Sequence, residues 1–446
     1  MELIYGIKDK PKFGKVILFA FQQLLAIMAA TIAVPAIVGN GLTASAALFG
    51  AGVGTIVYLL FTKSSSPVFL GSSFAFIGSM LSAFAGAASV QIGYWGLIIG
   101  ALMAGLVYVI IAIIVKICGV VWIDKLLPPV IIGPTVSIIG LSLSANAIGD
   151  LMKSSVAGGN EKIALICGLT TLAVTMLAST YGKNIGRLIP FILGILAGYA
   201  LASVFALIGN LTDNGALVVI NYDALKAVKG LFALPKFTFI LGGTEGLRNI
   251  SGTYLLTIFA AYVPVAFVVF AEHLADHKNL STIVGKNLLK EPGLTRTLLG
   301  DGVGTMVSTF FGGCPNTTYG ESIGCVAITR NASTISIWGC ACLCIIFSLI
   351  SPVVAFLETI PSCVMGGVCI ALYGFIAVSG FKMFQKVDLN KNRNLFVASV
   401  IFITGVGGMV VSFGKVEIRT VACALILGIL TNVMLSKEKD EAADAE

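Results

Sequence analysis

Charged side chains are scarce in this chain of 446 residues. Asp, Glu, Lys and Arg make up 11% of the sequence, whereas 57% of the residues are hydrophobic. A soluble domain carries about 25% charged residues, so this composition excludes a water-soluble globular protein and predicts a polytopic membrane protein. The first apolar segment, about residues 13–39, is too long for a signal peptide and is followed by no small-residue cleavage site.

Histidine is almost absent as well, with two residues, and none of the ten cysteines forms a C-x-x-C pair. We find no metal-ligand cluster, no nucleophile–base pair and no phosphate-binding loop. The sequence therefore predicts a protein that is not an enzyme and has no metal or cofactor, and nothing in it indicates binding to nucleic acid. The cysteines are expected to be small core residues of membrane helices.

Apolar runs that could each cross a bilayer follow one another along the whole chain, and they predict an all-α fold with fourteen transmembrane segments. The third, ninth and tenth are short or broken. The segments are centred near Ile27, Val53, Ile77, Val107, Ile138, Val174, Ala197, Pro264, Val303, Ile323, Ile346, Ile370, Phe402 and Leu427. Most of the 28 Lys and Arg residues fall on one side of this arrangement, which predicts that both termini are cytoplasmic and that the chain lies in the cell membrane.

A faint internal repeat is also present. Leu127-Pro-Pro-Val-Ile-Ile-Gly133 opens segment five, and Ile360-Pro-Ser-Cys-Val-Met-Gly366 opens segment twelve. An offset of seven spans predicts two inverted repeats, the plan of many secondary transporters. Such transporters bind substrate where corresponding segments are broken. Segments three and ten correspond, and both begin with Pro and carry Gly and hydroxyl residues, in the stretches 67–78 and 315–324.

Two carboxylates lie within the predicted membrane segments, Glu272 in segment eight and Glu321 in segment ten. A charge in hydrocarbon costs a few kcal/mol, so both are candidate functional residues, although a position near a helix end is the alternative. Asp276 lies one helical turn after Glu272 on the same face, either at the site or as a helix-end charge. His273 is expected to pack or to lie near a helix end. The acids expected to be ordinary interface charges are Asp301 and Glu358.

Broken helices expose backbone N–H and C=O groups that protein, water or ligand must satisfy. Two facing breaks, two carboxylates and the nearby rings of Phe74, Phe76 and Tyr319 suit a small, flat, neutral molecule with alternating N–H and C=O groups. Tyr373 in segment twelve either faces the same cavity or packs in the core. No Lys or Arg lies at depth, which disfavours an anion.

The chain resembles the bacterial uracil permeases of the nucleobase–ascorbate transporter (nucleobase:cation symporter) family over nearly its whole length. The family signature is an acid or amide followed by N-x-G-x-x-x-x-T-R, and it appears here as Glu321-Ser-Ile-Gly-Cys-Val-Ala-Ile-Thr-Arg330. The other stretches that carry the resemblance are Gly71-Ser-Ser-Phe-Ala-Phe-Ile77, Ala271-Glu-His273, Pro315-Asn-Thr-Thr-Tyr-Gly-Glu321 and Val364-Met-Gly-Gly-Val368.

The resemblance implies fourteen spans in two inverted seven-span repeats, with short strand-like pieces in spans three and ten. It also implies two domains, each built from both halves of the chain. Residues 1–126 (spans one to four) and 251–359 (spans eight to eleven) form a core domain. Residues 127–250 (spans five to seven and an external loop) and 360–446 (spans twelve to fourteen and a cytoplasmic tail) form a gate domain.

The resemblance further implies a proton-coupled symporter that imports uracil. Glu272 is expected to hydrogen-bond the pyrimidine and take part in proton coupling with Asp276, and Glu321 is expected to accept the ring N–H groups. The other implied contacts are the backbone N–H groups of Phe74 and Gly320, Ala30 near the ring, and Tyr319 and Tyr373 in the pocket wall.

Two positions depart from the family pattern. Ser322 replaces the signature Asn, and Asp276 stands where the uracil permeases carry His. Two acids one turn apart favour keeping one proton bound between them, so they act as a coupled pair. These departures leave xanthine, uric acid or another purine base as the alternative substrate and Na⁺ as the alternative ion to H⁺. An anion transporter is disfavoured, and a homodimer is left open.

Overall fold

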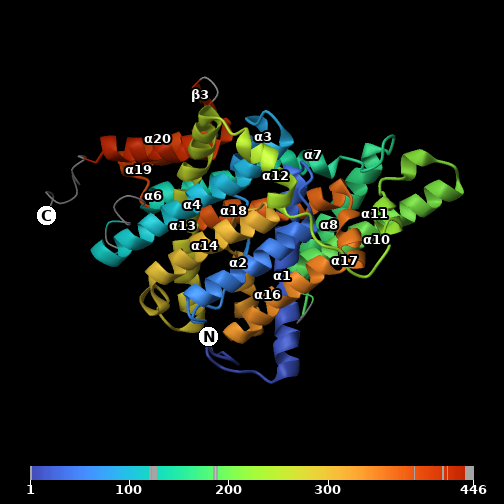
Figure 1. Cartoon of the computed structure of the whole chain (residues 1–446), viewed down its shortest axis with the longest axis horizontal. Coiled ribbons are helices and arrows are strands. Elements are labelled where there is room, and N and C mark those ends of the chain that lie inside the picture. The colour runs from blue at the N-terminus through green and yellow to red at the C-terminus, as the bar shows by residue number, and fades with distance from the viewer. Residues whose placement is uncertain are drawn as a thin grey trace.

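The computed structural model describes residues 3–119, 122, 128–183, 186, 189–385, 387–413, 416–418 and 420–436. Most of them lie in helices that pack into one elongated bundle (Figure 1). The predicted domain boundary between residues 126 and 127, Leu127 of the repeat motif and the predicted cytoplasmic tail after residue 436 lie outside the described residues.

Eight helical segments of the described chain are long and apolar enough to cross a membrane. They are α1 (Phe13–Val38), α2 (Ala44–Phe61), α4 (Val90–Cys118), α6 (Pro129–Ser142) continued by α7 (Ser144–Leu151), α8 (Glu161–Tyr181), α10 (Pro190–Leu211), α13 (Gly252–Val284) and α18 (Ser362–Phe384). Three shorter apolar helices are α16 (Thr334–Leu349), α19 (Asn392–Val406) and α20 (Thr420–Met434). A 15-residue helix is only about 22 Å long, which is less than the hydrocarbon thickness of about 30 Å.

Six other described elements are short or less apolar. They are α11 (Asp223–Lys226), α12 (Thr238–Arg248), α14 (Leu294–Gly312), α17 (Ser351–Glu358), a 3₁₀ turn (Gly215–Leu217) and a π-helical turn (Leu289–Gly293). Two strands that the sequence did not indicate, β3 (Val411–Phe413) and β4 (Val416–Ile418), form an antiparallel hairpin. The chain is thus mostly helical, with two small sheets.

The two predicted breaks lie side by side. Segment three consists of β1 (Leu70–Ser72) and the half-helix α3 (Ile77–Ala85), and segment ten consists of β2 (Asn316–Thr318) and the half-helix α15 (Gly320–Thr329). The strands pair antiparallel, with Leu70 opposite Thr318. The expectation of strand-like pieces in these two segments is confirmed, and each strand satisfies backbone groups that the other exposes.

Hydroxyl groups from neighbouring elements complete this strand pairing. Thr55 of α2 accepts a hydrogen bond from Leu70 N–H at 3.0 Å and donates to Leu70 C=O at 3.1 Å. The Tyr319 hydroxyl donates to Ser72 C=O at 2.8 Å, and its ring lies directly on Gly71. A Cβ at Gly71 would lie 2.3 Å from that ring, so only glycine fits there.

The helices pack in two groups. In the first, α2 lies against α14 and α16, and α4 lies against α13 and α14; in the second, α18 packs against α6 and α8, α8 against α10, and α19 against α6 and α20. Gly140 and Gly380 allow the backbones of α6 and α18 to approach closely. The helix α12 falls in the predicted range 127–250, yet it packs on α4 of the first group, where Trp95 Nε1 donates to Gly243 C=O at 2.8 Å.

Candidate substrate site

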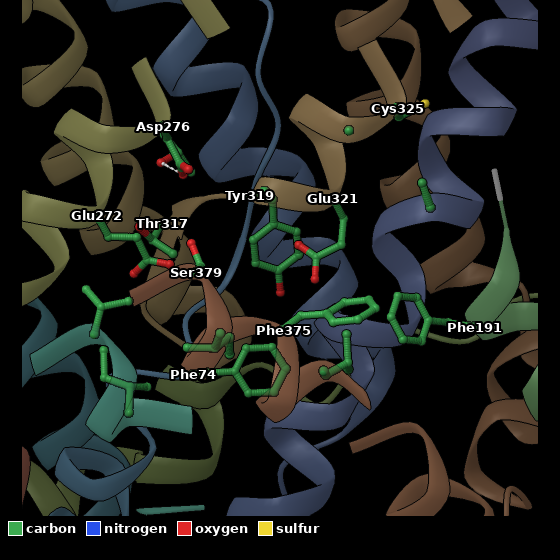
Figure 2. Close-up of a pocket in the computed structure, with 18 of the residues that line it drawn as sticks. Phe74, Phe191, Glu272, Asp276, Thr317, Tyr319, Glu321, Cys325, Phe375 and Ser379 are labelled. Atoms are coloured by element: carbon green, nitrogen blue, oxygen red, sulfur yellow. Dashed lines mark hydrogen bonds between the residues drawn. The ribbon is translucent and has the colours of Figure 1, made fainter. Parts of the chain in front are cut away.

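A cavity of about 330 Å³ lies beside the strand crossing, between the two helix groups (Figure 2). This volume is at the lower end of the range for small-molecule sites. Its wall is formed by Ala26, Phe74, Ala75, Val136, Ile139, Ser179, Pro190, Phe191, Glu272, Asp276, Thr317, Thr318, Tyr319, Gly320, Glu321, Gly324, Cys325, Ile328, Leu372, Phe375, Ile376, Ser379 and Met383.

Three carboxylates belong to the polar part of this wall. Glu272 and Asp276 project from α13, and Glu321 projects from the first turn of α15, with Tyr319 between Glu272 and Glu321 in the view of Figure 2. Asp276 Oδ2 accepts a hydrogen bond from Thr318 Oγ1 of β2 at 2.7 Å. None of the described residues that line the cavity is Lys, Arg or His, so no lining cation balances the acids.

Aromatic rings form the opposite side. Phe74, Phe191 and Phe375 lie together below the carboxylates in Figure 2. Phe74 also meets Tyr373 edge to face, with ring centroids 5.7 Å apart. A flat ligand can therefore lie against apolar rings while its edge faces the acids and the ends of the half-helices.

Six of the predicted site residues line the cavity: Glu272, Asp276, Glu321, Phe74, Tyr319 and Gly320. Two do not. Ala30 is buried in α1 and Tyr373 is buried in α18 with its ring against that of Phe74, and neither is part of the cavity wall. Their predicted contacts with a ligand, like those of the six, stay predictions.

Several lining residues were not predicted. Thr317 and Thr318 stand in the polar stretch of segment ten, so the signal was present in the sequence. Phe191 of α10 and Phe375 and Ser379 of α18 come from apolar helices with no local motif. Only the packing of the second helix group against the strand crossing brings them to the cavity.

The expectation for Asp301 is wrong. Asp301 lies two turns inside α14, with 1% of its surface exposed, and its Oδ2 is 2.7 Å from Nδ1 of the buried His273. His273 Nε2 is 3.0 Å from Thr297 Oγ1, and Thr297 donates its own hydroxyl proton to Leu294 C=O. His273 Nε2 is therefore the donor to Thr297. The hydrogen bond between His273 Nδ1 and Asp301 Oδ2 contains one proton, so the pair has no net charge.

Neighbouring contacts extend this buried network away from the cavity. His277 Nδ1 is 2.8 Å from the carbonyl oxygen of His273, so Nδ1 carries the proton. The Tyr58 hydroxyl oxygen is 2.8 Å from His277 Nε2 and donates its proton to Ser66 Oγ at 2.8 Å. The Ser66 hydroxyl, 3.3 Å from His277 Nε2, is therefore the donor available to that nitrogen. Both histidines are engaged in holding α13 against α2 and α14. Within the described residues, no group of three or more His, Cys, Asp or Glu side chains could hold a metal ion.

A helical membrane bundle with paired broken segments and a cavity at the break is the architecture of a membrane transporter. The chain belongs to the permease family that contains the xanthine and uracil permeases, the nucleobase–ascorbate transporters, and the family model matches residues 14–413. It is a transporter and not an enzyme.

Three relatives are similar over nearly their whole length, and each is named uracil permease. The protein of Bacillus subtilis is 37% identical, with 98% of this chain and 97% of the relative covered. That of Bacillus caldolyticus is 38% identical (97% and 94% covered), and that of Escherichia coli K12 is 36% identical (95% and 92% covered).

Solved structures of other transporters share the fold. The transmembrane domain of a cyanobacterium bicarbonate transporter, BicA, superposes with a TM-score of 0.64 at 14% identity, covering 96% of this chain and 99% of that one. The murine anion transporter Slc26a9 superposes with the same score at 11% identity, covering 96% and 69%. At this identity the likeness concerns the fold alone.

Proposed function

We propose that this protein is a proton-coupled symporter that imports uracil across the cell membrane. The observation that carries the proposal is the cavity at the strand crossing, where carboxylates and half-helix ends face aromatic rings. The names of the relatives at 36–38% identity support uracil as the substrate. The wall of aromatic rings also suits a flat base.

The hydrogen-bonding groups of the wall complement those of uracil, which has two ring N–H donors and two carbonyl acceptors. Glu321 accepts from the ring N–H groups. The backbone N–H groups of Phe74 and Gly320 donate to the carbonyl oxygens. Gly320 is the first residue of α15, and the N–H groups in the first turn of a helix have no partner within the helix. A neutral ligand with this pattern leaves few buried groups unpaired.

The three acids of the cavity wall support coupling of transport to a proton. Three carboxylates around one cavity without a lining cation repel one another, so at least one retains a proton. A protonated Glu272 can donate to a pyrimidine carbonyl, whereas an ionised Glu272 repels it. Proton and substrate then stabilise each other's binding, which is reciprocal coupling. A loaded, neutral site also crosses the low-dielectric barrier more easily than a charged one.

The proposed topology follows the two helix groups. The first group is the core domain and the second is the gate domain, with fourteen spans in two inverted repeats and both termini in the cytoplasm. Six further elements, α3, α14, α15, α16, α19 and α20, count as spans beside the eight long helical segments in this scheme because they pack within the bundle. Movement of one group against the other exposes the cavity to each side in turn.

Binding of radiolabelled uracil to the purified full-length protein tests the substrate. Glu321→Gln keeps the size of the side chain but places a donor opposite the ring N–H donors, so binding should fall to background. Glu358→Gln is the matched control, because Glu358 is exposed outside the cavity. Uracil should compete better than xanthine at equal concentration. Binding of Glu321→Gln within threefold of wild type contradicts the site, and the reverse order of competition indicates a purine transporter.

Uptake into proteoliposomes tests the coupling. Uracil uptake should rise as the external pH falls from about 8 to about 6, because the protonated site binds substrate. A protonophore should abolish accumulation. If uptake instead needs a Na⁺ gradient and ignores pH, the acids are part of a sodium site and the proton proposal is wrong.

A further inference from the structure

Ser322 lies at the joint between the two broken segments. It is in the first turn of α15, next to Glu321, and its side chain is completely buried. Its hydroxyl oxygen accepts a hydrogen bond at 2.9 Å from the backbone N–H of Phe69, the residue before β1. The carbonyl of Phe69 in turn accepts from Tyr319 N–H at 3.2 Å. Ser322 and Tyr319 thus continue the strand pairing by one step.

A second side chain contacts Ser322 from a helix that belongs to neither broken segment. Gln23 of α1 is buried, and its Nε2 donates to Ser322 C=O at 3.2 Å and also makes a hydrogen bond with Ser322 Oγ. The helix α1 packs against both α15 and β1. An amide therefore stands at this joint, although the signature amide is missing from position 322.

We infer that Gln23 supplies from α1 the amide that the family signature carries at position 322, and that Gln23 and Ser322 together position the substrate-binding groups. The inference rests on the proposed function for its binding readout. Glu321 is the neighbour of Ser322, and Phe74 follows two residues after β1. The joint therefore sets the distance between the carboxylate on one side of the substrate and the backbone N–H on the other.

The expected loss of uracil binding follows from how closely the binding groups must keep their positions. In enzymes, a displacement of about 1 Å in a positioned group can lower the reaction rate about a hundredfold. Loss of the Gln23 amide removes two hydrogen bonds from Ser322, the residue that accepts from Phe69 N–H, so we expect uracil binding to weaken about tenfold or more in Gln23→Ala. Neither Gln23 nor Ser322 lines the cavity, so the effect acts through Glu321 and the strand crossing.

The chain contains a matched control in the preceding residue. The Oε1 atom of Gln22 is buried but has no hydrogen-bond partner among the described residues. Gln22→Ala removes the same atoms from the same helix without touching the joint. It should keep uracil binding within about twofold of wild type.

The decisive variant relocates the amide. Gln23→Ala combined with Ser322→Asn moves the amide from α1 to position 322, where the family signature has it. Uracil binding by the purified full-length protein should return to within about threefold of wild type. The melting temperature of each variant in detergent shows whether the bundle stays folded. A role limited to stability predicts equal losses for the Gln22 and Gln23 variants and no recovery in the double variant, and that outcome overturns the inference.

A measurement without substrate separates this inference from the proposed function. Hydrogen–deuterium exchange over residues 67–74 measures the protection of the Phe69 N–H, which donates its hydrogen bond to Ser322 Oγ. Exchange should accelerate in Gln23→Ala, stay at the wild-type rate in Gln22→Ala and recover in the double variant. Unchanged exchange in Gln23→Ala refutes the inference. If the exchange pattern appears but the wild-type protein binds no uracil, the proposed substrate is wrong and the positioning role of Gln23 stands.

Discussion

The hydrogen bond between Thr318 and Asp276 gives the sharpest prediction about coupling. Thr318 Oγ1 donates to Asp276 Oδ2 at 2.7 Å. A hydrogen bond to an ionised group is worth about 1.5–3 kcal/mol, and one to a neutral group about 0.5–1.5 kcal/mol. The Thr318 hydroxyl therefore favours the ionised form of Asp276 by about 1–1.5 kcal/mol. Thr318→Val keeps the shape of the side chain but removes this donor.

The change should appear in the pH dependence of transport. At about 1.4 kcal/mol per pH unit, the proton on the acid pair is retained to a pH about one unit higher in Thr318→Val. The midpoint of uracil uptake into proteoliposomes, measured between about pH 5 and 9, should therefore move upward by about one unit. The sign follows because transport needs the protonated pair and the variant destabilises its ionised form more than its protonated form.

Two controls define the outcome that refutes this reasoning. Thr317 is the adjacent residue of β2, and its buried hydroxyl has no partner among the described residues. Thr317→Val should leave the midpoint in place, even if it changes the affinity. In an Asp276→Asn background, Thr318→Val should no longer shift the midpoint, because the group that it acts on is gone. An unshifted midpoint in Thr318→Val alone, or an equal shift in Thr317→Val, excludes Asp276 from the coupling.

Three further predictions address coupling, packing and access. Glu272→Gln mimics the protonated carboxyl, so it should retain uracil binding but lose pH dependence and uphill accumulation; a normal pH profile would remove Glu272 from the proton pathway. Gly71→Ala places a Cβ 2.3 Å from the Tyr319 ring and should destabilise the protein by about 1–3 kcal/mol, seen as a lower melting temperature, whereas an unchanged value contradicts the close packing. Cys325 lines the cavity, so a small thiol reagent should block uptake, uracil should slow the block, and Cys325→Ser should abolish it; equal sensitivity in that variant points to another cysteine.

The sequence predicted the broken segments because their chemistry differs from that of their surroundings. Pro67 and Pro315 each open a run of glycine and hydroxyl residues inside a hydrophobic chain, and the strands begin close to both prolines. Glu272 and Glu321 could be identified for the same reason, because a carboxylate is costly in an apolar segment and is rarely found there without a function.

The sequence could not predict what depends on contacts between distant segments. Asp301 looked like a charge near a helix end, and only the packing of α13 against α14 showed its buried partner, His273. Phe191 and Phe375 carry no signal along their own helices, because the apolar residues of a membrane helix look alike whether they face lipid or a cavity. The sequence predicted fourteen spans, whereas eight helical segments of the described residues are long and apolar enough to cross a membrane. The two numbers differ because hydropathy does not show where a short helix ends.

The pairing of β1 with β2 has a consequence for how the protein is made. The two strands are joined residue by residue, yet Leu70 and Thr318 are separated by most of the chain. When the first half enters the membrane during synthesis, β1 has unpaired backbone groups in a nonpolar environment, and these stay unsatisfied until β2 has been translated and inserted. The incomplete chain therefore lacks not only half of its binding groups but also the partner that stabilises the other half. Assembly of the two halves and formation of the strand crossing are therefore one event, and a truncated product carries β1 without its partner strand.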